Sequence, residues 1–81
     1  MEKRIAVVGI VIENLVNASI VNNILHSFAN IIVGRFGIPY RERNISVISI
    51  IVDGTSDEIS SMTRKLGKIN GVTVKTALTK K

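Results

Sequence analysis

Few side chains in this sequence of 81 residues could carry out chemistry, and they do not form a catalytic set. Cysteine is absent and His26 is the single histidine, which excludes thiolate metal sites, a histidine cage and a cysteine nucleophile. His26 falls on the polar side of a predicted helix, so we interpret it as an ordinary surface histidine. We therefore predict a protein without catalytic residues, without a metal site and without a cofactor.

Basic side chains outnumber acidic ones, 11 to 6, and give a formal net charge of +5. Such a charge raises the possibility of binding to nucleic acid. The basic residues are scattered along the whole chain, however, and we interpret them as a solvated basic surface. A nucleic-acid partner is accordingly not expected, since net charge alone would support one.

Two segments have the pattern of strands that are buried on both sides, Arg4–Ile12 and Ile45–Asp53. Apolar side chains occupy both alternating positions, whereas a strand covered on one side would alternate with polar residues. We expect both segments to be central in a sheet. Ile32–Phe36 and Val72–Thr79 are predicted as further strands, the latter with a one-sided pattern that suits an edge, and Gly37–Tyr40 as a turn or loop.

Two helices are predicted between these strands. Ala18–Asn30 carries apolar residues at helical spacing, and Asn17 before it is the expected N-cap. The second helix begins at a capping box formed by Thr55 and Glu58, and Gly71 is its expected stop.

The order strand, helix, strand occurs twice, which is typical of two split βαβ units. Right-handed crossovers place the first and third strands in the middle of a four-stranded antiparallel sheet, where their apolar faces also require them. We predict one α+β domain over residues 1–81, a ferredoxin-like βαββαβ sandwich with both helices on one face of the sheet. The opposite, apolar face lacks a cover, so we expect a homodimer or tetramer formed through the sheet face or edge.

Several uses of this scaffold can be tested against the sequence. RNA recognition needs aromatic rings on the two central strands, and these strands have none. A copper or zinc carrier needs two cysteines in the first loop. Phosphate hydrolysis of the acylphosphatase type needs an arginine there, whereas Glu13–Asn17 has a glutamate that would repel phosphate. A regulatory or assembly module remains.

Nearly the whole chain resembles the small standalone ACT-like proteins described as iron-only hydrogenase system regulators. The resemblance is carried by the segments Gly34–Glu42, Val47–Gly54 and Leu66–Val74, and Gly37–Glu42 (GIPYRE) is its most specific part. It implies an ACT-like fold related to the ligand-sensing domain of the nickel-responsive repressor, and a role in hydrogenase maturation or expression. The loop Glu13–Asn17 lacks the glycine of amino-acid-binding ACT domains, and the repressor's nickel ligands have no counterparts.

Our leading hypothesis is a cytoplasmic, homo-oligomeric regulator that acts through a small-molecule effector or a protein partner. An assembly module without a ligand is the alternative, and weak nucleic-acid binding is a third. The longest apolar run, Ile5–Ile12, is far shorter than the about 20 residues that span a bilayer, and no signal-peptide pattern is present. A ligand site is expected where the first loop of one subunit meets the second strand and its loop in a neighbour. Its candidate residues are Asn14, Asn17, Arg35, Tyr40 and Arg41.

Overall fold

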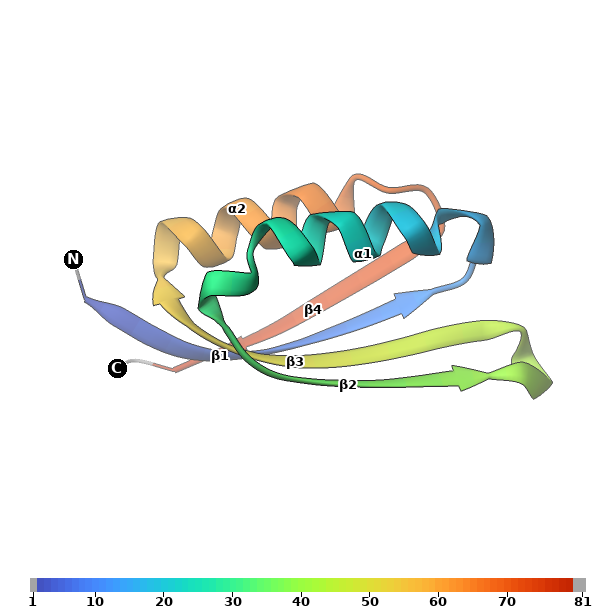
Figure 1. Ribbon diagram of the computed structural model, residues 1–81, viewed down its shortest axis with the longest axis horizontal. Helices are drawn as coiled ribbons and strands as arrows, with labels where there is room; N and C mark the ends of the chain where they lie inside the picture. Colours follow the sequence, from blue (N-terminus) through green and yellow to red (C-terminus); the bar gives the residue numbers. More distant parts are fainter. Residues whose placement is uncertain (1, 80–81) are drawn as a thin grey trace.

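Strands and helices alternate in the predicted βαββαβ order in the computed structural model, which describes residues 2–79 (Figure 1). Short 3-10 turns at Leu15–Asn17, Ala29–Ile31 and Arg41–Arg43 join several of the elements. Both helices lie on the same face of the sheet (Figure 1), as predicted. The elements are β1 (Lys3–Ile12), α1 (Ala18–Ser27), β2 (Ile32–Tyr40), β3 (Ile45–Thr55), α2 (Ser56–Gly67) and β4 (Val72–Leu78).

The four strands form one antiparallel sheet in the order β2-β3-β1-β4. This order confirms that the first and third strands are central and that the last is an edge. In the register of the two central strands, Gly9 lies opposite Ser49 and Val7 opposite Ile51. The fold is therefore the ferredoxin-like sandwich predicted from the apolar periodicity of the strands.

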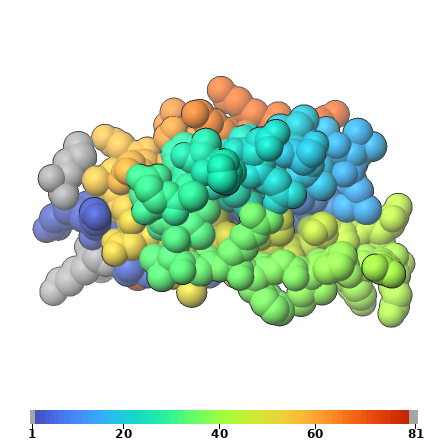
Figure 2. Space-filling model, in the orientation of Figure 1, coloured from blue at the N-terminus to red at the C-terminus, as the bar shows by residue number. Residues whose placement is uncertain are grey.

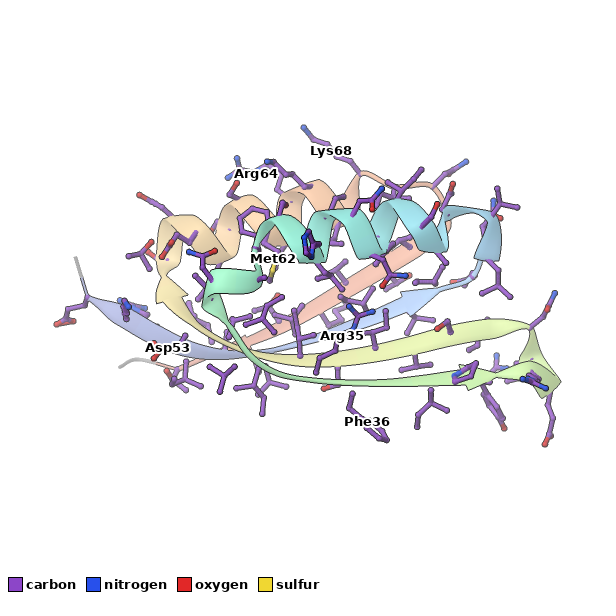
Figure 3. All side chains as sticks on the ribbon, in the orientation of Figure 1. Arg35, Phe36, Asp53, Met62, Arg64 and Lys68 are labelled. Carbon is purple, nitrogen blue, oxygen red and sulfur yellow. The ribbon has the colours of Figure 1, made fainter. Side chains whose placement is uncertain are left out.

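One hydrophobic core lies between the sheet and the helices. Even-numbered residues of β1 and β3 point into it, and Met62 and Leu66 of α2 are fully buried there. Figure 3 shows Met62 on the helix side of the sheet. Each fully buried aliphatic side chain contributes about 1.5–3 kcal/mol relative to an exposed one. The buried residues are Ala6, Val8, Ile10, Ile12, Val21, Leu25, Ile31, Ile48, Ile50, Val52, Ile59, Met62 and Leu66.

The first helix departs from the prediction at both ends. It ends at Ser27, and a 3-10 turn follows where helix had been predicted to Asn30, because β-branched Ile31 and Ile32 suit the transition into a strand. The predicted capping by the Asn17 side chain is wrong. That side chain instead donates its Nδ2 hydrogen to the carbonyl oxygen of Asn70, at 2.8 Å, while Asn14 accepts from the amide of Val16.

The second strand continues through the segment that was predicted to be a loop. Gly37–Tyr40 pairs with β3 as far as Tyr40 and Ile45, so that prediction is wrong. Pro39 is accommodated because β2 is an edge strand, where a missing amide hydrogen need not break the ladder. Asn44, with φ 58°, then closes the hairpin in the left-handed conformation. The hairpin extends beyond the helix layer (Figure 1).

The second helix begins as predicted. Thr55 Oγ1 accepts from the Glu58 amide at 3.2 Å, and Glu58 Oε1 accepts from the Thr55 amide at 2.9 Å, which completes the capping box. These hydrogen bonds to Thr55 hold the pKa of Glu58 below its ordinary value. The helix ends earlier than predicted, at Gly67, and Gly71, with a φ of 75°, instead lies in the turn just before β4.

Candidate functional site

The sheet face opposite the helices is open and apolar. Figure 3 shows Phe36 pointing away from the helices on this side, and 65% of its surface is exposed. Other large apolar side chains share the face because they alternate with the buried positions of the same strands. We call this surface the open sheet face; its large apolar residues are Ile5, Val7, Val11, Phe36, Ile38, Tyr40, Ile45, Val47 and Ile51.

Two small residues, which we call the trough, lie side by side in the middle of the open sheet face. Gly9 of β1 and Ser49 of β3 lie side by side in register, and Phe36 of β2 is the next residue of the same row. A Cβ atom at Gly9 would lie 3.9 Å from the Lys75 carbonyl oxygen, an ordinary contact. The row thus places a large exposed ring beside two small residues.

The side chains expected to bind a ligand lie in three separate places within one chain. Asn14 and Asn17 belong to the junction between the first loop and the loop before β4. Asn17 donates to the Asn70 carbonyl, and the Glu13 amide donates to the Gly71 carbonyl at 2.7 Å. Both asparagines therefore have structural hydrogen bonds in the subunit itself.

Tyr40 and Arg41 lie at the far end of the β2–β3 hairpin. Tyr40 is paired with Ile45 and belongs to the open sheet face, and Arg41 begins the exposed 3-10 turn beyond it. Arg35 lies apart from both and points toward α1 (Figure 3). A site that joins the first loop to β2 would require a second chain, so the five residues remain candidates for such a site.

Arg35 reaches across from β2 to α1, where its Nη2 donates to the Asn22 side-chain oxygen. A groove of about 610 Å³ lies between these two elements, which both face the viewer in Figure 2. The sequence interpretation missed three polar residues of this groove, Asn22, Asn23 and His26. These three residues lie within about one helical turn of the predicted helix, and this spacing was the sequence signal that could have indicated a shared polar surface. The lining residues are Asn22, Asn23, Leu25, His26, Ala29, Ile32 and Arg35.

A second depression, of about 530 Å³, lies between the end of β1 and the hairpin turn. Its lining includes both Glu13 and Arg43, so it presents charges of opposite sign. Among residues 2–79, no three histidine, aspartate or glutamate side chains are grouped so that they could hold a metal ion. Over the same residues, no helix is long and apolar enough to cross a membrane.

Comparison with known proteins places the chain in a family. The sequence model of one family matches residues 4–76, and that family is described as "TM1266-like: Iron-only hydrogenase system regulator, putative". The chain belongs to the TM1266-like family. The resemblance inferred from the sequence is thereby confirmed.

A solved structure supports the fold of this TM1266-like chain. It is described as the uncharacterized protein TM1266 from Thermotoga maritima, and it is 38% identical in sequence. The similarity covers 98% of this chain and 100% of that one, with a TM-score of 0.93. No curated protein matches the chain significantly.

Proposed function

We propose that this TM1266-like chain is a cytoplasmic regulator of an iron-only hydrogenase system that self-associates, binds a small effector or a protein partner, and performs no catalysis. The observation that carries the proposal is the open sheet face. An apolar surface of this extent on a small domain is typical of a protein interface. The family description supplies the system on which the regulator would act.

A second copy of the chain is the occupant that best suits the open sheet face. The 10 residues of β1 give the face a length of about 33 Å, and four strands about 4.8 Å apart give it a breadth of about 19 Å. The resulting footprint of about 600 Å² is of the order of the roughly 800 Å² of accessible surface that each partner buries in a stable dimer. Side chains standing out from the sheet enlarge the accessible area further.

The arrangement of large and small side chains on the open sheet face also favours a second copy of the chain as its partner. In a two-fold dimer each surface contacts the same surface of its partner. The exposed Phe36 ring of one subunit would then pack over the trough formed by the other subunit's Gly9 and Ser49. A nucleic acid would find few cations here, since Lys75 on β4 is the one basic residue in the row that contains Gly9.

Self-association can be tested by native mass spectrometry and light scattering at micromolar concentration. Phe36→Asp places a charge in the centre of the proposed interface, and we expect it to produce monomers. Val16→Asp is the matched control, because Val16 is 83% exposed and lies in the 3-10 turn before α1, away from the sheet. A monomeric wild type, or equal effects of the two substitutions, would contradict the interface.

The regulatory role requires a measurement in cells. In a host that contains both this gene and an iron-only hydrogenase, deletion of the gene should change the amount or activity of the hydrogenase. Wild type and Val16→Asp should restore the normal level, whereas Phe36→Asp should not. Unchanged hydrogenase in the deletion strain would reject the regulatory role and leave an assembly module.

A further inference from the structure

Arg35 is a cation that hydrogen-bonds to a neutral side chain and has no counter-ion among the described residues. Its Nη2 donates to Asn22, and within residues 2–79 no carboxylate pairs with the guanidinium. An arginine side chain has five N–H donors, so most of its donors remain available. The bond to Asn22 holds the exposed guanidinium beside the groove that both residues line.

The groove beside Arg35 has no acidic side chain among its described lining residues. The sequence has no aspartate or glutamate between Glu13 and Glu42, a stretch that includes the whole of α1 and β2. No residue that lines the groove is acidic, although the protein has six acidic residues. The electrostatic potential of the groove is therefore set by Arg35 and favours an anion.

The groove offers a polar wall and an apolar floor. Asn23 and His26 of α1 add hydrogen-bonding groups on the side opposite Arg35. Leu25 is buried and Ile32 is partly buried, and together with Ala29 they supply the apolar part. The volume, about 610 Å³, falls within the roughly 300–1,000 Å³ range of small-molecule sites.

We propose that this groove between α1 and β2 binds a small organic carboxylate with a short apolar chain. The carboxylate would accept two parallel hydrogen bonds from the Arg35 guanidinium, the geometry that arginine forms best. Asn23 and His26 would contact the remaining lone pairs, and the apolar chain would lie on Leu25, Ala29 and Ile32. This inference names the class of effector and in that respect rests on the proposed function.

The mixed lining is the reason for choosing a carboxylate over inorganic phosphate. A phosphate has oxygens on every side and would leave some of them against Leu25 and Ile32, without hydrogen-bond donors. An alkyl carboxylate has one polar end and one apolar end, as the groove has. The groove lies on the helix side of the sheet, so it would stay open when the open sheet face is covered.

Titration of the isotope-labelled protein with sodium butyrate, followed by NMR at constant ionic strength, tests the proposal. We expect saturable shifts at the groove residues and none with butanamide, the neutral analogue. Arg35→Gln should weaken butyrate binding at least tenfold, and Asn22→Ala should weaken it less because the guanidinium remains but loses its support. Arg64→Gln is the matched control: it removes the same charge from an exposed position on α2.

Three results would overturn the proposal. Equal binding of butyrate and butanamide would show that the charge plays no part. Tighter binding of inorganic phosphate at the same residues would assign the groove to a different anion class. Equal losses in Arg35→Gln and Arg64→Gln would indicate unspecific attraction to a basic protein. None of these results depends on hydrogenase levels, so the groove and the regulatory role fail separately.

Discussion

Gly71 connects α2 to β4 with a backbone conformation that other residues adopt at a cost. Its φ is 75°, and a Cβ atom there would lie 2.8 Å from the Cβ of Asn14. Its carbonyl also accepts the Glu13 amide, which ties the first loop to the last. Gly71→Ala should therefore lower the free energy of unfolding by about 2 kcal/mol, measured by urea denaturation at fixed protein concentration.

Gly67→Ala provides the control for that substitution. Gly67 is the last residue of α2, and a Cβ atom there would meet no other atom within 4 Å. Alanine at this position should leave stability unchanged or raise it by up to about 1 kcal/mol, since it is the better helix former. Equal stability of the two variants would show that the close approach of Gly71 to Asn14 is not a constraint.

Individual side-chain roles were the least predictable part of the candidate site. Asparagine is a common N-cap residue, but the side-chain amide of Asn17 donates to the carbonyl oxygen of Asn70, 53 positions along the chain. Local sequence spacing does not reveal such a contact. The direction of Arg35 depends on an irregularity in β2 between Ile32 and Gly34. A shift of one residue exchanges the two faces of a strand, and this one turns Arg35 toward α1 and Phe36 to the open sheet face.

At the scale of elements, the capping box of α2 is a local feature with a measurable effect. Thr55 Oγ1 accepts the amide hydrogen of Glu58 in the first turn, and Glu58 Oε1 accepts that of Thr55, the N-cap residue. Thr55→Ala should cost about 1 kcal/mol of unfolding free energy because one of these bonds is lost. Ser60→Ala, at an exposed position in the middle of the same helix, should have no such cost. An equal change in both variants would contradict the role of the cap.

The same box predicts a dependence of stability on pH. The pKa of Glu58 is lowered in the folded chain, chiefly by its hydrogen bonds to Thr55, so the unfolded chain binds the proton more tightly. The carboxylate therefore contributes stability above its ordinary pKa of 4.5, and this contribution is lost as the pH falls through the folded-state value. Glu58→Gln should show a smaller loss of stability between pH 6 and pH 3 than wild type does, with urea midpoints as the readout. An unchanged pH profile would reject the prediction.

The elements themselves were largely predictable, because their signals are local. Double-sided apolar patterns identified β1 and β3, and the capping residues identified the start of α2. The extension of β2 through Pro39 was missed, since proline usually ends a strand and only the edge position of β2 permits it. Its hairpin enlarges the open sheet face by Ile38 and Tyr40, so this error concerned the candidate interface directly.

At the scale of the whole molecule, glycine at position 9 has opposite expected effects on the stability of the subunit and on its association with a second copy. Glycine in the middle of a strand is unfavourable for a subunit alone, by roughly 0.5–1 kcal/mol relative to alanine. A Cβ atom would fit the isolated subunit, because its nearest neighbour, the Lys75 carbonyl oxygen, would be 3.9 Å away. If Gly9 leaves room for the Phe36 ring of a second copy, it stabilises the interface between subunits and not the fold of one subunit.

Gly9→Val should therefore change two properties in opposite directions. The β-branched side chain should preserve or raise the stability of the subunit, measured by urea unfolding at a concentration where the protein is monomeric. It should also fill the trough and weaken dimerisation at least tenfold, measured by analytical ultracentrifugation. Ala77→Val, also on the open sheet face but on the edge strand β4, is the control for added volume outside the trough and should weaken dimerisation less. Unchanged association of Gly9→Val would show that the interface does not include the centre of the sheet. A less stable Gly9→Val monomer would show that glycine is needed at this position for the fold.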